Sequence, residues 1–385
     1  MGVAAVFCGL LLVGVVLSDL VRRSMLSMAV LFLAGGIVIG PVLRLSSLSP
    51  TDPLLHHVTE LALFAVLFSD GMRVDLSRRE GSWQVPARAL LLGVPITVVL
   101  GAIAGTTFTT LGWAEAALVA AVLAPTDPVF ASAIVGREGV PARLRRLLNI
   151  ESGLNDGLAL PIVIVLIEIN TDEPVRVLTL VADIAFGLAI GVVVPALTLW
   201  LERSRLPSVS DVYGVLNGLA IGALVFTVSS LTGANLFVAA FVAGIVIGRR
   251  SDHVVTSFER IGEPISEVLK VLAVFLFGML LHASLFRTLS WGSVALIAVF
   301  LFAIRPLALG ISLAGTGIPR DEFAVAAWFG PRGFASVVYG LLVLGSTTDQ
   351  AGLDFSIIAA TIAASIVLHS STDVPISKYF ERKEA

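Results

Sequence analysis

Four polar residues stand near the start of an apolar run that is long enough to cross a membrane. The run reads LNIESGLNDGLALPIVIVL over residues 148–166, and its polar members include Glu151, Ser152, Asn155 and Asp156. On a helix, residues four apart share a face, so Glu151 with Asn155 and Ser152 with Asp156 form one polar face. Burial disfavours the charged form of a carboxylate, so an acid there can hold a proton or a cation. A small site does not hold both well, and we expect the two to compete.

A second polar group interrupts the segment LVAAVLAPTDPVFASAIVG at residues 118–136. Pro125 and Pro128 bracket Thr126 and Asp127 at about the middle of this apolar stretch. Two prolines three residues apart remove backbone donors and crowd preceding carbonyls, so the helix should open there. In a membrane such a break is tolerated where it lines a cavity or packs within protein.

The two polar groups together can supply the ligands of a monovalent cation. Such an ion needs several oxygen ligands, which carboxylates, hydroxyls and carbonyls freed by a broken helix can provide. We therefore predict a sodium site at Asp156, Asp127, Thr126 and Ser152. No cofactor is expected, and the single cysteine, Cys8, excludes a disulfide within the chain and a cysteine metal cluster.

Composition identifies the solvent of these segments. Hydrophobic residues make up 57% of the 385 residues and charged residues 14%, and the mean hydropathy is +0.97. An ordinary soluble domain is far less apolar. In hydrocarbon every backbone polar group must be satisfied within the chain, so long apolar segments predict helices rather than barrel strands. The chain is therefore expected to be an all-α integral membrane protein.

Hydropathy predicts about 13 membrane-spanning helices. The expected spans are residues 3–18, 25–40, 57–70, 86–108, 115–135, 149–167, 177–201, 212–229, 234–248, 264–282, 289–314, 321–344 and 353–371. The loops between them are short, so we expect one transmembrane domain over residues 1–385 and no soluble domain.

The positions of Lys and Arg predict the orientation of these spans. Of the 25 Lys and Arg residues, 19 fall in alternate loops and in the C-terminal tail, while Arg44, Arg176 and Arg287 occupy the other loops and Lys270, Arg305 and Arg332 lie within spans. Cytoplasmic loops carry the excess of basic residues. This distribution predicts a multi-pass protein of the plasma membrane with its N-terminus outside and its C-terminus in the cytoplasm.

A second interrupted helix is expected in span 12, which reads AAWFGPRGFASVVYG. Gly330, Pro331 and Gly333 flank Arg332 at a depth similar to that of the break in span 5. Spans five and twelve are an odd number apart and so run in opposite directions. Paired broken helices indicate inverted-topology repeats and a transport site between them. We place the first repeat at about 25–167 and the second at about 212–371.

Three further charged residues are expected to support the site. Arg332 should neutralise a carboxylate and complement helix ends, with Asp70 or Glu151 as its candidate partner, and Arg305 has the same interpretation. Glu151 itself either ligates the ion or supports the site. Asn155 is either a ligand or a cap of the broken helix. A purely structural pairing of Asp156 with Arg332 or Arg305 is the alternative to a transport role for Asp156, although ionisable residues inside the membrane are mostly functional.

These motifs together resemble one known family. APTDPVFAS, then ESGLNDG and later GPRGFAS are similar to the NhaP-type branch of the monovalent cation/proton antiporters, the sodium/proton exchangers, and the resemblance covers nearly the whole chain. By similarity Thr126 and Asp127 match the family's helix-five site. Glu151 and Ser152 match a polar pair on helix six, and Asn155 with Asp156 match the Asn-Asp signature of that helix. Arg332 matches the helix-twelve arginine, and Asp70 stands where relatives often carry its acidic partner.

The resemblance implies the activity and the partners. It implies a homodimer in the lipid bilayer that exchanges one Na⁺ or Li⁺ for one H⁺ by alternating access, electroneutrally, without nucleic acid or cofactor. Alternatives are a K⁺/H⁺ antiporter, a passive cation channel or a sodium-coupled organic solute carrier on the same scaffold. An intramembrane aspartyl protease, the one enzyme considered, needs sequence contexts that Asp127 and Asp156 lack.

Overall fold

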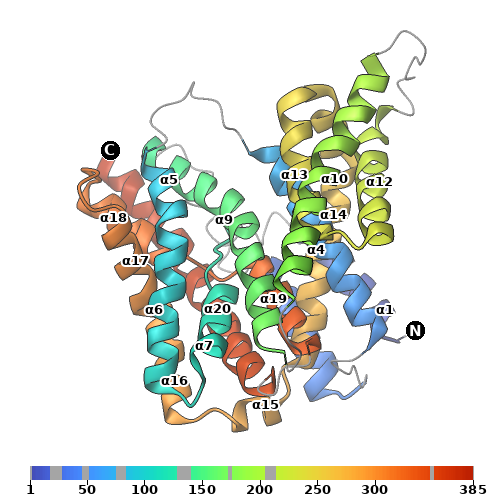
Figure 1. The fold of residues 1–385 in the computed structure, drawn as a ribbon. Coiled ribbons are helices and arrows are strands. Elements are labelled where there is room, and N and C mark those ends of the chain that lie inside the picture. Colours follow the sequence, from blue (N-terminus) through green and yellow to red (C-terminus); the bar gives the residue numbers. More distant parts are fainter. Residues whose placement is uncertain are drawn as a thin grey trace. The chain divides into compact units, whose positions relative to one another are not determined.

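The structure is a computed structural model, and it describes residues 2–17, 28–45, 52–74, 84–127, 140–171, 176–203, 214–346 and 351–384. In these ranges every regular element is a helix (Figure 1). Packing divides the chain into two units. Unit 1 comprises Met1–His57, Gly81–Asp172 and Val271–Ala385, and unit 2 comprises Val58–Glu80 and Glu173–Lys270.

Unit 1 holds most of the helices. In chain order they are α1 (Gly2–Val16), α3 (Met28–Ile37) with the π-helical turn η1 (Val38–Val42), α5 (Gln84–Leu91), α6 (Gly93–Phe108), α7 (Trp113–Val122), α9 (Ala142–Ile169), α15 (Ala283–Arg287), α16 (Trp291–Val299), the π-helical turn η4 (Phe300–Ile304), α17 (Arg305–Ser312), α18 (Arg320–Trp328), α19 (Phe334–Gly345) and α20 (Ala351–Glu384). Unit 2 contains α10 (Val177–Arg203), α12 (Asn217–Thr232) and α13 (Leu236–Arg250). Helices α4 (Pro53–Arg73) and α14 (Asp252–Leu280) each contribute residues to both units.

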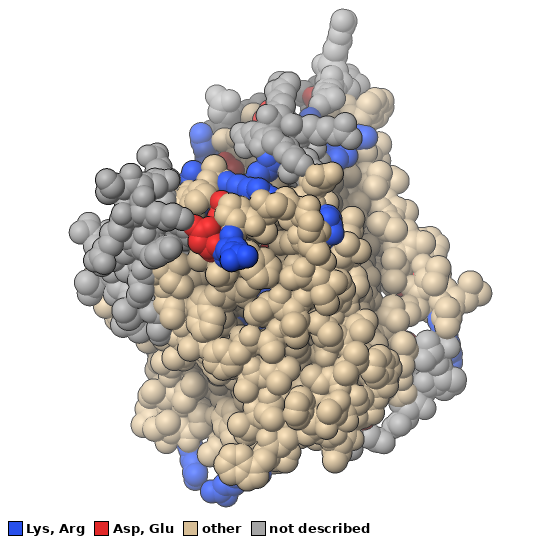
Figure 2. Space-filling view, turned by 90° about the vertical axis from the view of Figure 1, so that its left-hand side faces the viewer, with Lys and Arg blue, Asp and Glu red and all other residues tan. Residues whose placement is uncertain are grey.

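The helices have the length and composition of membrane spans. Five segments are long and apolar enough to cross a bilayer: Gln84–Phe108, Ala142–Ile169, Val177–Glu202, Trp291–Ser312 and Gly352–His369. Figure 2 views the molecule from the side of α5, α6 and α17, and there Lys and Arg lie towards two ends of a broad uncharged surface. Each of the 13 predicted spans overlaps at least one described helix, although in the span 115–135 the helix ends at Val122. The membrane-protein class agrees with the sequence, and the number of crossings stays a prediction.

Two predicted spans are less regular than expected. The fourth span divides at Leu92 into α5 and α6, and Pro95, which lacks a backbone donor, lies in the first turn of α6. The eleventh span contains the π-helical turn η4, which is followed by Pro306 at the start of α17. Proline removes an i to i−4 hydrogen bond, which local π geometry accommodates. Hydropathy alone could not reveal either irregularity.

An apolar cluster joins several helices of unit 1 at the ends that the sequence predicts to face the cytoplasm. Leu144, Leu147 and Leu148 of α9 pack with Leu309 of α17 and with Phe329, which follows α18, and all five side chains are buried. Helix α5 joins the same cluster. Glu151 lies one turn after Leu147 on α9, and Arg305 lies one turn before Leu309 on α17, so both charged residues stand next to this cluster.

One packing motif occurs in both units. In unit 1, the sequence GIVIG at residues 36–40 lies against the backbone of residues 275–279 of α14, which read FLFGM. In unit 2, the same GIVIG at residues 244–248 lies against residues 68–72 of α4, which read FSDGM. A methyl group on either terminal glycine of each GIVIG would overlap backbone atoms of the facing helix. Only glycine permits this close approach of two helices.

Candidate functional site

The two interrupted segments meet in unit 1. Helix α7 ends at Val122 and residues 123–127 are not helical, while residues 329–333 are not helical between α18 and α19. The Asp127 N–H donates to the Pro331 carbonyl at 3.0 Å. The Phe334 N–H donates in turn to Asp127 Oδ2 at 3.2 Å. Asp127 is therefore placed as an N-terminal cap of α19, where a carboxylate interacts favourably with the helix dipole. Pro128 lies outside the described residues.

Close contact between these segments depends on Gly333. A methyl group at Gly333 would overlap the Cβ and the carboxylate of Asp127, because the Asp127 side chain occupies that space. We predict that Gly333→Ala separates the segments, lowers the melting temperature and reduces any activity of the site at least tenfold. Gly153→Ala is the matched control, since a methyl group at Gly153 meets open space and alanine favours a helix. Equal melting temperatures for the two variants would contradict the contact.

Helix α9 buries the polar face that the sequence predicts. Glu151, Ser152, Asn155 and Asp156 are all buried, whereas Leu158 is exposed. The helix is continuous through this region despite Pro161 in its second half. The four polar residues therefore face the interior of unit 1, and α9 contacts both α7 and α19.

Asn155 joins α9 to the first interrupted segment. Its Nδ2 donates to Thr126 Oγ1 at 2.8 Å and to the Thr126 carbonyl at 3.3 Å. Asn155 Oδ1 is buried and accepts no hydrogen bond from the described part of the chain. The amide therefore holds Thr126 in place and keeps one oxygen available. Of the two roles open to Asn155, the contact with Thr126 supports the structural one, and a ligand role stays a prediction.

Asp156 is anchored through its backbone by a residue that the sequence did not indicate. The Tyr339 hydroxyl donates to the Asp156 carbonyl at 2.8 Å, and Tyr339 is fully buried on α19. The Asp156 side chain is also buried, with 8% of the residue exposed. A phenol in the mostly apolar segment 334–345 was the available signal, since a buried tyrosine hydroxyl usually finds a hydrogen-bond partner.

Glu151 forms its ion pair with Arg305. Arg305 Nη1 and Nη2 lie 2.7 and 3.0 Å from the two Glu151 carboxylate oxygens, and Arg305 Nε donates to the Ala326 carbonyl at 3.0 Å. This geometry is bidentate, and both residues are buried. Glu151, one of the two candidate partners of Arg332, therefore pairs with Arg305. The supporting role of Arg305 at the site stays a prediction.

Arg332 instead contacts backbone carbonyls. Its Nη1 donates to the Ala124 carbonyl at 3.3 Å, just beyond the end of α7, and its Nη2 lies 3.5 Å from the Phe300 carbonyl in η4. A cation is stabilised at the carboxyl end of a helix. These contacts place Arg332 beside the end of α7, and its supporting role stays a prediction.

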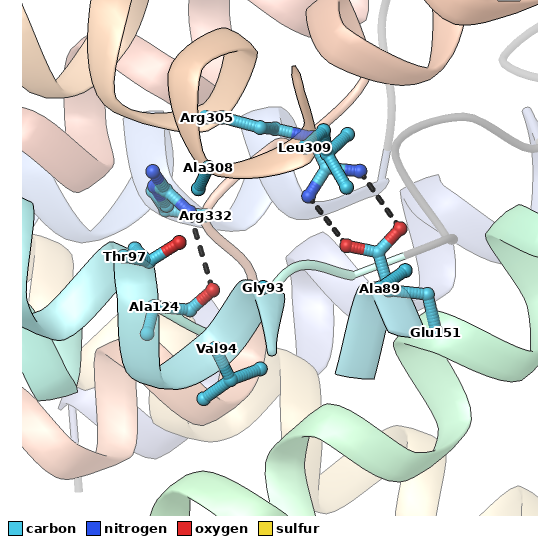
Figure 3. Close-up of a pocket in the computed structure, with 10 residues that line it drawn as sticks. All are labelled: Ala89, Gly93, Val94, Thr97, Ala124, Glu151, Arg305, Ala308, Leu309 and Arg332. Carbon is cyan, nitrogen blue, oxygen red and sulfur yellow. Dashed lines mark hydrogen bonds and ion pairs between the residues drawn. The ribbon is translucent and has the colours of Figure 1, made fainter. Parts of the chain in front are cut away.

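The two arginines and Glu151 border a small cavity (Figure 3). Its lining residues are Ala89, Gly93, Val94, Thr97, Ala124, Glu151, Arg305, Ala308, Leu309 and Arg332, and its volume is about 10 Å³. A polar cavity of this volume has room for roughly one water molecule. Figure 3 shows the paired Arg305 and Glu151 on one side and Arg332 with the Ala124 carbonyl on the other.

A buried network on α20 holds the second interruption. The Arg332 N–H donates to Ser365 Oγ at 2.8 Å, and Ser365 Oγ lies 3.0 Å from His369 Nδ1. Trp328 packs its ring 5.3 Å from that of His369 and donates to Thr372 Oγ1 at 2.9 Å. The network therefore touches both sides of residues 329–333. The sequence analysis missed it because a serine and a histidine on an apolar helix give no local indication of their partners.

Asp70, the other candidate partner of Arg332, does not belong to unit 1. It is half-buried on α4, in unit 2, whereas Arg332 belongs to unit 1. The pairing of Asp70 with Arg332 stays a prediction.

The described residues contain no group of three or more His, Cys, Asp or Glu side chains placed to hold a metal ion. A monovalent cation would depend on hydroxyl and carbonyl oxygens beside the carboxylates. Unit 1 brings Thr126 and Asn155 into contact and buries Ser152 and Asp156 on the helix beside them. The sodium site itself stays a prediction.

Comparison with known proteins identifies the family. A sequence model described as "Sodium/hydrogen exchanger, transmembrane" matches residues 5–378. The chain belongs to the sodium/hydrogen exchanger family. That match confirms the family resemblance drawn from the three motifs, and it gives the intramembrane protease alternative no support.

Named relatives of this family member differ in their ion. A "K(+)/H(+) antiporter NhaP" of Alkalimonas amylolytica is 23% identical over 84% of this chain, and a "K(+)/H(+) antiporter NhaP2" of Shewanella sp. (strain ANA-3) is 24% identical over 94%. The chain spans 57% and 64% of the lengths of these two relatives. A "Na(+)/H(+) antiporter NhaP" of Pseudomonas aeruginosa is 25% identical over 81% of this chain and 78% of its own length.

A solved structure shares the fold of this family member. The sodium proton antiporter MjNhaP1 from Methanocaldococcus jannaschii superposes with a TM-score of 0.79 over 98% of both chains, at 16% sequence identity. A second structure of MjNhaP1, determined by electron microscopy, gives a TM-score of 0.74 over 97% of this chain and 96% of that one. These matches establish an antiporter fold.

Proposed function

We propose that the chain exchanges a monovalent cation, Na⁺ or Li⁺, for a proton across a membrane. The observation that carries this proposal is the burial of Asp156 on α9, one residue beyond Asn155, whose amide holds Thr126 of the first interrupted segment. Family membership supports the exchange, and the names of the relatives support a monovalent cation.

Asp156 is the group that alternates between a proton and the cation. Asp127 is engaged as a cap of α19, and Glu151 is paired with Arg305, so both acids already have partners within the protein. Asp156 is buried on α9, the helix that also carries Glu151. Asp156 binds either one proton or one monovalent cation, and each carries a single positive charge. One positive charge therefore crosses the membrane in each direction, and the exchange is electroneutral.

The cation is held by mixed oxygen ligands. The Asp156 and Asp127 carboxylates, the Thr126 and Ser152 hydroxyls and the available Asn155 Oδ1 form the proposed set. Arg305 and Glu151 act behind this set by fixing α9 against α17. Arg332 offsets the carbonyl ends exposed by the interruption of α7.

The proposal includes the arrangement of the chain in the membrane. We propose 13 spans, with inverted repeats at about 25–167 and 212–371 and broken crossing helices in spans five and twelve, in a single transmembrane domain. The GIVIG crossing present once in each unit supports the repeats. The distribution of Lys and Arg supports a plasma-membrane location with the C-terminus in the cytoplasm. A homodimer and alternating access complete the proposal.

Potassium is the second candidate cation. The two relatives from Alkalimonas and Shewanella are named K⁺/H⁺ antiporters, and they align over most of this chain. Na⁺, Li⁺ and K⁺ differ in radius and in the cost of dehydration, so the same ligand set can favour any of them.

Proton flux in sealed proteoliposomes tests the proposal. Sodium, lithium and potassium are added in turn to vesicles that contain a pH-sensitive dye, with the membrane potential held at zero and then displaced. We expect cation-dependent proton movement that ranks sodium or lithium first and that does not respond to the potential. Flux that follows the potential would contradict electroneutral exchange, and the absence of proton movement with every cation would contradict antiport.

A further inference from the structure

A single peptide group joins α20 to Asp127. It is the group between Pro331 and Arg332, in the interrupted segment 329–333. Its carbonyl accepts the Asp127 N–H at 3.0 Å, and its N–H donates to Ser365 Oγ at 2.8 Å. A peptide group is planar and rigid, and its C=O and N–H point in opposite directions. Asp127 and Ser365 therefore hold the same rigid unit from opposite sides.

The neighbouring helices do not fix the orientation of this peptide group. Helix α18 ends at Trp328 and α19 begins at Phe334, so the group lies outside the hydrogen-bond ladders of both. Within the described part of the chain, its hydrogen bonds are those to Asp127 and Ser365. A buried backbone N–H without a partner is costly. The Ser365 hydroxyl therefore both satisfies this N–H and orients the group.

Ser365 is held in turn by His369, one turn further along α20. Both residues are buried, and His369 Nδ1 lies 2.9 Å from the Ser365 carbonyl oxygen and 3.0 Å from its Oγ. A carbonyl only accepts, so Nδ1 carries the hydrogen in this contact. Thr372, on the same face of α20, accepts the indole N–H of Trp328 at 2.9 Å. This face of α20 therefore holds the chain on both sides of the second interruption.

The side chain of Asp127 depends on the same segment as its backbone. The Phe334 N–H donates to Asp127 Oδ2 at 3.2 Å, two residues after the peptide group that accepts the Asp127 N–H. The Asp127 side chain also fills the space in front of Gly333. A rotation of the peptide group would therefore move the Asp127 backbone and its carboxylate together.

We propose that Ser365 is a positioning residue of the cation site, which places the Asp127 carboxylate through the peptide group between Pro331 and Arg332, and that His369 orients Ser365. Neither residue of α20 contacts the cation. The inference rests on the proposed function, in which Asp127 is one of the ligands. Binding groups must be held within about 0.5 Å of their productive positions, so loss of this support weakens the site without removing a ligand.

The sodium dependence of proton flux in proteoliposomes tests this role. Ser365→Ala removes the hydroxyl with little change of shape, and it should raise the sodium concentration for half-maximal flux about tenfold, with a smaller effect on the maximal rate. Thr361→Val is the matched control, because the buried Thr361 hydroxyl, one turn earlier on α20, donates to the Ile357 carbonyl of its own helix. It should leave that concentration unchanged. Half-maximal flux of Ser365→Ala at the wild-type concentration would overturn the proposal.

Hydrogen–deuterium exchange of the purified protein gives a readout that does not require transport. Ser365→Ala should speed amide exchange about tenfold in peptides that contain residues 123–127, because the Asp127 N–H loses a fixed acceptor, and also over residues 329–334. Thr361→Val should change neither region. Faster exchange confined to α20 would mean that Ser365 only stabilises its own helix, and the proposal would fail. Absence of cation-dependent flux in the wild type would refute the exchange function and leave this link measurable.

His369→Phe is the second variant, and it keeps a ring of similar bulk but lacks the Nδ1 hydrogen. It leaves the Ser365 hydroxyl in place, so exchange over residues 123–127 should rise by less than in Ser365→Ala. Wild-type exchange in a folded His369→Phe protein would overturn the role assigned to His369.

Discussion

An Asp156→Asn protein should fold normally and move no protons in response to sodium, lithium or potassium. Asparagine keeps the shape of the side chain but binds neither a proton nor a cation with the affinity of a carboxylate. Since Asp156 is buried on α9 and its carbonyl is held by Tyr339, the substitution should leave the backbone in place. We expect transport to fall below detection in proteoliposomes, while the melting temperature stays close to that of the wild type.

The control for this result is Asp252→Asn, which removes an exposed acid by the same chemical change. It should transport like the wild type. Sodium-driven proton movement by a folded Asp156→Asn protein would remove Asp156 from the exchange step, and Asp127 would then be the next acid to test.

Arg305→Met should cause the largest loss of stability among single substitutions at the site. It leaves the Glu151 carboxylate buried without its bidentate partner. Breaking a buried ion pair from one side costs about 3–5 kcal/mol, because the remaining charge is uncompensated. Arg287→Met is the control, since Arg287 lies exposed at the end of α15 and its loss should change stability little.

A double variant separates the ion pair from packing. In Arg305→Met with Glu151→Gln neither charge remains, so most of the lost stability should return. Thermal unfolding of the two single variants and the double variant gives the coupling energy. Additive losses would show that Glu151 and Arg305 act independently, contrary to the 2.7 and 3.0 Å contacts between them.

The sequence indicated which residues of the site would be buried, since the spacing of Glu151, Ser152, Asn155 and Asp156 requires only a helix. The prolines also predicted that the helices are interrupted near Pro125 and Pro331, with backbone groups left outside helical hydrogen bonding, because proline disrupts the interior of a helix. Both inferences use residues within a few positions of one another, and a single sequence contains that information.

Partners across the fold were harder to predict. Glu151 had two buried arginines as candidates, and hydropathy does not distinguish Arg305 from Arg332. The choice depends on the packing of α9 against α17, which the leucines around Leu147 and Leu309 determine. Ser365 and His369 lie on α20, and Ser365 accepts a hydrogen bond from Arg332 in the interrupted segment 329–333, more than thirty positions away. No local pattern in the sequence identifies such a contact.

The repeated GIVIG sequence shows the opposite case. Its five residues occur at 36–40 and 244–248 and are visible in the sequence alone. Their meaning depends on the facing segments, since each copy packs on a five-residue stretch that runs from phenylalanine to methionine and has glycine at its fourth position. A short apolar repeat is common in membrane helices, and only the shared packing gives it significance.

Proton release on cation binding tests the central claim most directly. Sodium is added to the purified protein in a weakly buffered detergent solution, and a pH-sensitive dye reports the protons that the protein releases. Competition at Asp156 predicts the release of about one proton per protomer from the wild type and none from Asp156→Asn, because only a protonated carboxylate has a proton to lose. Sodium binding to the wild type without proton release, or equal release from both proteins, would contradict the account.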